Sequence, residues 1–503
     1  MFQPIRFEPE IEDLVRFVEE TEPDRIVEGT VAKLRGGVST KAMLTASALA
    51  VIRSTDVSVG HHGGPTHPVC GIHPVYHLAG RLPGEWSYLP VVQNIHLSNK
   101  HIHSQEMGPY ILPELAGVEA KDVLGLRAKG TVRASEGTLE ETRDNFLSMM
   151  QMKYPAAAEG HLVYLLGKMP GNEVLDLILT KAIPKNPNDD HYFLYPMYST
   201  RAVDCLGWEW APVLFRPVVR WQARNPFMGN SSVFEEIEGL LDKYELLEKT
   251  IPLHTAQSET DSIGELGERI GACDDFSAIP EILAAALAHG LSLEGAGEAL
   301  SIGAATIFLR TDYGNPMDAH LHTGANVRRY LITREGVSLR NKLLALLTWN
   351  TGPEITLSLD KLEWSPRFDE ETVARLPDRD QEALLDAIEE SINNQPKVED
   401  LGVAKLPQMR TAPELRESMA LAQQYAERQY DPMALFLRLG MITCRDNFTE
   451  MHALKHHQAV VEEFHSTREP FRWVHLVSAV KHTTIAHAKW QDVYTEAREL
   501  LKV

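Results

Sequence analysis

The sequence contains few cysteines for its length, and those it has are far apart. The four are Cys70, Cys205, Cys273 and Cys444 in a chain of 503 residues, and none forms a CxxC pair. Disulfide frameworks and thiolate zinc sites need numerous or closely spaced cysteines. The sequence therefore indicates neither, and it favours a reducing compartment.

Positive charge and long apolar runs are also scarce. Lys and Arg number 49 against 70 Asp and Glu, which gives a formal net charge of −21. A surface this acidic repels the phosphates of nucleic acids and of anionic membranes. No stretch reaches the roughly 18 consecutive apolar residues of a membrane span, and the acidic N-terminus lacks the basic-then-apolar order of a signal peptide. We therefore expect a cytoplasmic protein that binds neither nucleic acid nor membrane.

Several catalytic motifs are absent. The sequence has no GxSxG, no GxxxxGK[ST], no HExxH and no GxGxxG after a strand pattern. These are signatures of serine hydrolases, P-loop enzymes, zinc metalloproteases and Rossmann enzymes. A convincing set of alternating strands is lacking as well, whereas helical spacing of apolar residues is common. The sequence therefore predicts an all-α fold.

Local signals mark several helix boundaries. Ser39 is placed to cap the helix that follows it. Residues 66–81 are expected to form a second helix that Pro74 kinks, and residues 86–103 a third. His191 is expected to open a further helix after the turn-rich segment IPKNPNDD.

Similar helical units recur along the chain. The helix ending in Arg310-Thr311-Asp312 resembles the one ending in Arg53-Ser54-Thr55-Asp56. Residues 317–330 also align without gaps with residues 451–464, which matches His322 with His456. We interpret these units as degenerate helical-hairpin repeats packed around a central histidine-lined pocket.

The repeat core is expected to cover residues 1–354, including the first histidine cluster. An acidic, turn-rich stretch at residues 355–440 is expected to be a helical insertion. The histidine-rich helices of residues 441–503 would then complete the core.

Histidine is the residue type that stands out. Eight of the 21 histidines lie between Val59 and His103, and seven more between His452 and His487. Neutral imidazole is the commonest protein metal ligand, so this density predicts a metal or catalytic centre. For each histidine taken singly, the alternative is a structural role as a helix cap or a packed, hydrogen-bonded side chain. His61 and His62 lie in a Gly-Pro turn and form either a lid or a surface turn.

One small pattern occurs three times: a histidine, a hydroxyl or thiol residue at i+3, and Gly or Ala at i+4. The instances are His67/Cys70/Gly71, His320/Thr323/Gly324 and His475/Ser478/Ala479. On a helix these residues share a face, and the small ones let helices approach closely. Three such helices could direct three imidazoles at one metal ion and leave positions open for substrate or oxygen.

Three short segments resemble the histidine motifs of the questin oxidase-like proteins. They are His73-Pro74-Val75-Tyr76-His77-Leu78, His320-Leu321-His322-Thr323-Gly324-Ala325 and His475-Leu476-Val477-Ser478-Ala479. Those proteins are helical, and the named member opens an anthraquinone ring by Baeyer-Villiger oxidation. The resemblance implies an oxygenase, with NADPH as a cofactor. The Gly-Gly-Pro histidine loop, the NKHIHS segment and the insertion depart from the family pattern and leave the substrate unassigned.

These observations lead to a metal-dependent oxygenase or oxidase that acts on a small organic substrate. The expected metal is iron or another first-row transition metal. The expected metal ligands are His67, His320, His456 and His475, and the expected catalytic residues are His73, His77 and His322. A catalytic histidine would move protons while the metal acts as Lewis acid and oxygen carrier.

Two alternatives stay open. The first is a metal-assisted hydrolase or lyase that uses the same ligands without redox chemistry. The second is a non-catalytic helical-repeat scaffold, or a haem or metal carrier, whose concave surface binds a partner. The acidic surface and the many apolar helices are compatible with a homodimer.

Overall fold

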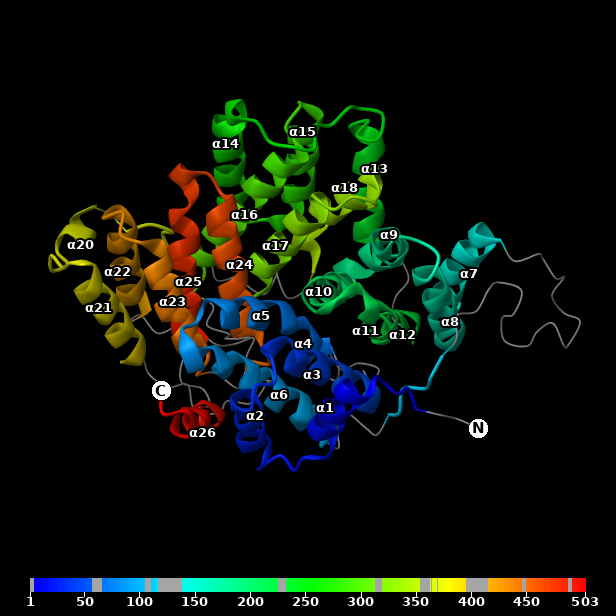
Figure 1. The fold of residues 1–503 in the computed structure, drawn as a ribbon. Coiled ribbons are helices and arrows are strands. Elements are labelled where there is room, and N and C mark those ends of the chain that lie inside the picture. The colour runs from blue at the N-terminus through cyan, green and yellow to red at the C-terminus, as the bar shows by residue number, and fades with distance from the viewer. Residues whose placement is uncertain are drawn as a thin grey trace, which may run out of the picture. The chain divides into compact units, whose positions relative to one another are not determined.

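The fold is all-α, as the sequence predicts, in a computed structural model of the chain (Figure 1). The structure describes residues 4–56, 66–104, 110–115, 138–224, 232–312, 319–352, 362, 364–368, 370–394, 415–445, 449–486 and 491–503. Within these ranges the chain forms helices and no β-strand, and the single β-bridge, between Pro4 and Pro113, is isolated.

The helices follow one another closely along the chain. The first are α1 (Pro9–Glu20), α2 (Ile26–Arg35), α3 (Thr40–Ser54), α4 (Thr66–Cys70), α5 (Ile72–Arg81), α6 (Tyr88–Ile102), α7 (Leu139–Gln151), α8 (Pro155–Leu166), α9 (Gly171–Ala182), α10 (His191–Leu206), α11 (Ala211–Leu214) and α12 (Arg216–Arg224). They are followed by α13 (Ser232–Lys243), α14 (Thr260–Gly271), α15 (Ile279–Ala288), α16 (Leu293–Arg310), α17 (His320–Ile332), α18 (Leu339–Leu347), α20 (Glu370–Ala374), α21 (Gln381–Asn393), α22 (Leu415–Glu427), α23 (Pro432–Thr443), α24 (His452–Ser466), α25 (Trp473–Ala486) and α26 (Asp492–Leu501). Short 3-10 helices are η1 (Gly84–Ser87), η3 (Ile183–Asn188), η4 (Trp208–Trp210), η5 (Gln257–Glu259), η6 (Phe276–Ala278), η7 (Trp349–Thr351) and η10 (Glu469–Phe471).

The local boundary predictions hold at three places and fail at one, and the helix expected over residues 86–103 is α6. The Ser39 hydroxyl accepts a hydrogen bond from the Ala42 amide at 3.1 Å, so Ser39 caps α3. His191 opens α10, as predicted. The helix expected across residues 66–81 is instead two helices that break at Gly71. The predicted kink at Pro74 is wrong, because Pro74 lies in the first turn of α5, where a missing backbone N–H costs no helical hydrogen bond.

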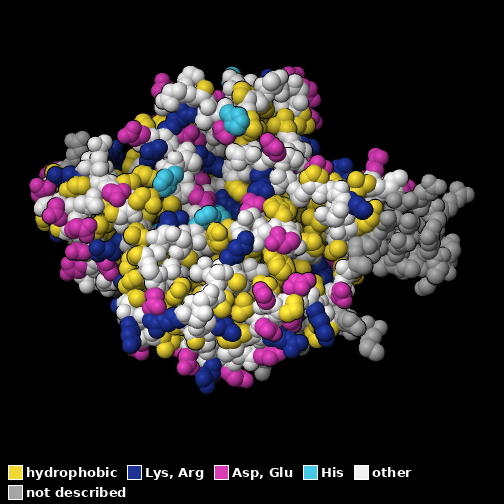
Figure 2. Space-filling model, viewed as in Figure 1, with side chains coloured by type: hydrophobic (Ala, Val, Ile, Leu, Met, Phe, Trp, Pro, Cys, Tyr) yellow, Lys and Arg dark blue, Asp and Glu magenta, His cyan; other side chains and the backbone are white. Residues whose placement is uncertain are grey.

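The chain divides into two compact units, which we describe separately. The first unit comprises Met1–Tyr76, Asn94–Phe234 and Arg334–Asn341, and the second comprises His77–Gln93, Glu235–Thr333 and Lys342–Val503. No helix in the described part of either unit is long and apolar enough to cross a membrane. Figure 2 shows acidic and basic side chains interspersed over the visible surface, without a field of one sign.

Buried and partly buried ion pairs join the helices of the first unit. Arg53 on α3 binds Glu12 at 2.8 Å and Glu19 at 2.6 Å, both from α1. Arg216 and Arg220 on α12 both bind Glu159 of α8. Because a buried charge is costly without a partner, these contacts fix how α1, α3, α8 and α12 pack.

Small residues bring helices of the second unit close together. A Cβ atom added to Gly303 of α16 would lie 2.4 Å from the Ile270 Cγ2 atom of α14 and 3.2 Å from the Gly267 carbonyl oxygen. Only glycine fits this helix crossing. Helix α16 also packs against α17 and α25, and α24 packs against both of those helices (Figure 1).

We predict that Gly303→Ala destabilises the fold by about 1–3 kcal/mol, because the new methyl group forces α14 and α16 apart. The matched control is Gly239→Ala on the exposed face of α13, where an added Cβ meets no atom within 4 Å. That substitution should stabilise the protein by up to about 1 kcal/mol through the entropy of the unfolded chain. Urea unfolding measures both effects, and equal shifts in the two variants would contradict the close crossing.

Candidate functional site

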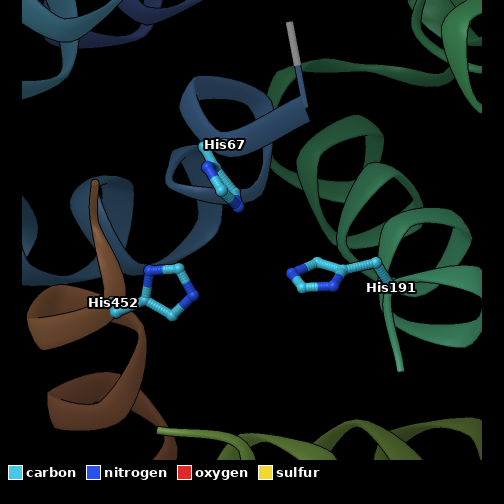
Figure 3. A group of neighbouring side chains, drawn as sticks. All are labelled: His67, His191 and His452. Atoms are coloured by element: carbon cyan, nitrogen blue, oxygen red, sulfur yellow. The ribbon is translucent and has the colours of Figure 1, made fainter. Parts of the chain in front are cut away.

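Two histidines of the first unit, His67 and His191, face one another. A ring nitrogen of His67 lies within 4.8 Å of one of His191, and their ring centroids are 5.9 Å apart. Figure 3 shows the two side chains pointing into the same space from α4 and α10, which pack together. Both are buried. Small side-chain rotations would let both imidazoles bind one metal ion at the usual nitrogen distance of about 2.1 Å.

The carboxylate of Asp189 orients one of these imidazoles. Nδ1 of His191 donates a hydrogen bond to Oδ1 of Asp189 at 2.7 Å, and the backbone amide of His191 donates to the same oxygen at 2.9 Å. This contact assigns the proton to Nδ1 and leaves the lone pair on Nε2. Metal-binding histidines commonly have such a carboxylate at their second nitrogen, where it fixes the tautomer and raises ligand basicity.

The local sequence accounts for this arrangement. Segment 187–191, Pro-Asn-Asp-Asp-His, ends the 3-10 helix η3 and begins α10. Asp189 has an extended backbone, with φ −169°, which directs its side chain back to the first residue of the new helix. Helix α10 is buried along most of its length, so His191 enters the interior of the unit rather than solvent.

Aromatic side chains enclose the His191 side of this pair. The ring of Tyr195 lies 5.0 Å from that of His191 and 6.3 Å from that of His67. Trp221 of α12 lies 5.1 Å from Tyr195, and Tyr192 stacks on Trp221 at 4.3 Å. These rings are buried and exclude water from the neighbourhood of His191.

The second unit contains a larger group of buried histidines, which we call the α25 histidine group: His322, His456, His475 and His482. Nε2 of His456 lies 3.3 Å from Nδ1 of His322, and the rings of His456 and His482 stack at 4.0 Å. The His475 ring lies 6.0 Å from that of His322. Helices α17, α24 and α25 supply these side chains.

Phe308 of α16 contributes the apolar wall of this group. Its ring lies 5.3 Å from His322 and 5.5 Å from His456. A second pair, His320 and His452, stacks at 5.7 Å at the starts of α17 and α24. Figure 3 also draws His452, a residue of the second unit.

Burial keeps these imidazoles uncharged. Desolvation lowers the pKa of His475 to about 3, with a further contribution from Arg329, and that of His457 to about 3, with a contribution from Arg81. The same cause lowers the pKa of His322 and of His456 well below the usual value of 6.5. At neutral pH their nitrogens are therefore available as neutral donors and acceptors.

The residues that the sequence singled out lie in both units. His67 and His73 are buried in the first unit, while His77 is exposed although it is only one helical turn beyond His73. His320, His322, His456 and His475 are all buried in the second unit. Of these, the structure brings His322 together with His456 and His475. His61 and His62 lie outside the described residues.

Sequence reasoning missed Asp189 and did not give His191 a site role. The signal for them is local: two consecutive acidic residues directly precede a histidine at a predicted helix start. It likewise gave no site role to His482, although the spacing of seven residues after His475 places both on one face of a helix.

Comparison with known proteins identifies no relative. The chain matches no family model, no curated protein and no solved structure. The function therefore has to be argued from the geometry of the two units.

We predict that the free energy of unfolding falls as the pH drops below about 6.5. The unfolded chain takes up protons on its histidines near that pH, whereas folded His457 and His475 stay neutral down to about pH 3. The contribution of these two histidines to the free energy of unfolding is thus complete above pH 6.5. Below that pH, each of them lowers the free energy of unfolding by about 1.4 kcal/mol per pH unit. Urea unfolding at pH 7.5, 6 and 5 measures the slope.

Replacement of one group isolates its share of this slope. His457→Leu should reduce the slope of the free energy of unfolding against pH by the share of one proton, about 1.4 kcal/mol per pH unit, whatever its effect on stability at pH 7.5. The control is Phe436→Leu, because the Phe436 ring lies 6.4 Å from His457 and does not titrate. An unchanged slope in His457→Leu would contradict a neutral buried imidazole.

Proposed function

We propose that the chain is a metal-dependent oxidoreductase, an oxygenase or oxidase that acts on a small organic substrate. The proposal places a first-row transition metal, iron in the first instance, on His67 and His191. The observation that carries it is the Asp189–His191 contact, which leaves the His191 Nε2 lone pair on the side of His67. Positions not taken by these two imidazoles are left for further ligands, oxygen and substrate.

The surroundings of His191 favour redox chemistry over hydrolysis. A hydrolase must admit water to its metal, whereas Tyr195 and Trp221 form a dry aromatic wall beside this imidazole. Exclusion of water protects reactive intermediates from side reactions. The three motifs that resemble questin oxidase-like proteins point to the same class of reaction.

The residues of the chain have separate tasks in this proposal. His67 and His191 hold the ion, which supplies Lewis acidity and electron transfer when bound. Asp189 keeps the proton of His191 on Nδ1 and stabilises positive charge that the imidazole acquires on binding. Tyr195 and Trp221 fix the ring orientations by packing.

We predict that the protein, purified without an affinity tag, contains a stoichiometric first-row metal. Removal of a neutral nitrogen ligand weakens the site, so His67→Ala and His191→Ala should each lose most of the metal. Elemental analysis measures the content. His254→Ala is the control, because this exposed histidine contacts only Glu294 among the contacts the structure shows and should leave the content unchanged. Retention of metal in both ligand variants, together with its loss in His456→Ala, would move the site to the second unit.

We predict that Asp189→Asn lowers metal affinity by roughly 10- to 100-fold without removing a ligand, because the amide no longer fixes the His191 tautomer or its basicity. Titration of the metal-free protein with Co(II), followed by absorption, measures the dissociation constant. Asp386→Asn, an exposed carboxylate of α21 paired with Arg438, is the matched control. Equal affinities for the two variants would contradict the orienting role.

The identity of the bound metal separates the redox proposal from its rival. Iron or another redox-active ion, with a matching absorption or paramagnetic resonance spectrum, supports an oxygenase or oxidase. A colourless, redox-silent ion such as zinc would instead favour a hydrolase or lyase on the same two histidines.

A further inference from the structure

The α25 histidine group leaves buried polar atoms that make no hydrogen bond to the described residues. They include Nδ1 of His475, Oγ of Ser478 and Nε2 of His322. All three side chains are at most 1% exposed. A buried polar atom without a partner costs about 1–3 kcal/mol, so a ligand that bonds to these three atoms would gain stability from each contact.

Ser478 shows that this is not a general property of the helix. Two other hydroxyls of α25 satisfy themselves by bonding to a carbonyl one turn back: Thr483 to Ala479 at 2.8 Å and Thr484 to Val480 at 2.7 Å. The Ser478 hydroxyl could reach the Val474 carbonyl in the same way, and it does not. The Ser478 hydroxyl is therefore not engaged by the backbone of its own helix.

His475 also lacks a hydrogen bond that other histidines of its unit make to a backbone carbonyl one turn earlier. Nδ1 of His465 bonds to the Val461 carbonyl at 2.7 Å, and Nδ1 of His289 to the Ala285 carbonyl. Nδ1 of His475 makes no such bond, although its ring is fully buried. His475 and Ser478 are three residues apart, so both open atoms lie on one face of α25.

The hydrogen-bond network assigns the proton on His475. Its Nε2 lies 3.2 Å from the hydroxyl of buried Thr467, and that hydroxyl also accepts a bond from Arg329. An arginine can only donate, and among the described residues Nε2 of His475 is the other contact of this hydroxyl, so the hydroxyl hydrogen of Thr467 is donated to Nε2. The imidazole, neutral because burial lowers its pKa to about 3, then carries its proton on Nδ1. His475 thus offers an N–H donor and no lone pair at its open nitrogen.

The charges nearby restrict what this donor can receive. Glu463 of α24 is buried and bonded to Ser301, Asn326 and Arg329, so its charge is already paired with that of Arg329. Lys481, also buried on α25, adds a positive charge near His322 and donates hydrogen bonds to the carbonyls of Phe308 and Thr311. A cation would meet that charge and the proton at Nδ1. An anion would lose its hydration in an interior where none of the three site side chains is more than 1% exposed. The remaining class is an uncharged molecule with an acceptor oxygen.

We propose that His475, Ser478 and His322 form a binding site for a small uncharged molecule that presents a carbonyl or hydroxyl oxygen. The N–H of His475 and the hydroxyl of Ser478 donate to that oxygen, and the ring of Phe308 packs near His322 against the apolar part of the molecule. Thr467 is a positioning residue, since it holds the His475 tautomer without touching the ligand. This site does not depend on the metal proposed for the first unit.

The test uses neutral ketones, from acetone to cyclohexanone, as probes of the full-length protein. Saturation-transfer NMR should show saturable binding of at least one ketone. Ser478→Ala should weaken it by about three- to tenfold, the worth of one hydrogen bond. The matched control is Thr483→Val, which removes a hydroxyl of the same helix that is already bonded, and it should leave binding unchanged. Cyclohexylammonium, a cation of similar shape, should not bind.

A second measurement addresses the tautomer. In protein labelled with 15N-histidine, the His475 ring should show a proton on Nδ1, and Thr467→Val should remove that preference and weaken ketone binding as well. The proposal is overturned if no ketone binds saturably, if Ser478→Ala and Thr483→Val bind alike, or if His475 carries its proton on Nε2. A buried water alone would give the first of these results.

Discussion

The hydrogen bond at the second ring nitrogen determines what each buried histidine can do. In His191 a carboxylate accepts from Nδ1, so the opposite nitrogen keeps a lone pair and can bind a metal ion. In His475 a hydroxyl donates to Nε2, so the opposite nitrogen carries a proton and acts as a donor. Two side chains of one type, both buried in helical units, thus acquire opposite chemistry from one contact each.

Both roles require an uncharged ring, and the fold enforces this by burial. A protonated imidazole could neither bind a metal ion nor remain in the interior without a counter-ion. Among the described residues of the second unit, the buried carboxylate that acts on His322 is Glu463, and it is bonded to Arg329, so protonation of His322 or His475 would leave charge uncompensated. Close helix crossings, such as the one at Gly303, keep solvent away. The helical framework and the protonation states therefore depend on the same packing.

Helix type and helix boundaries could be predicted because their signals are local. The Ser39 cap and the start of α10 at His191 need only neighbouring residues. Pro74 was misjudged because its effect depends on where the helix begins, which Gly71 decides. The gap-free alignment matched His322 with His456 as equivalent positions of a repeat and predicted no contact, whereas the structure places the two rings in contact. The repeat itself stays a prediction.

The candidate sites were less accessible from sequence, for a reason that follows from these contacts. Histidine density indicated that chemistry was present, but burial and the second nitrogen's partner decide its kind. His73 and His77 look alike in sequence, yet only His73 is buried. Which face of α5 is covered depends on the helices that pack against it, and the local sequence does not show this. The partner of His191 is two residues away and could have been read from the segment Asp189-Asp190-His191. The partner of His475 is Thr467, before the intervening η10 turn, and only the folded chain brings the two together. The role of a histidine can thus be predicted from sequence when the group that orients its ring is a neighbour in the chain. It cannot be predicted when that group is brought to the ring only by folding.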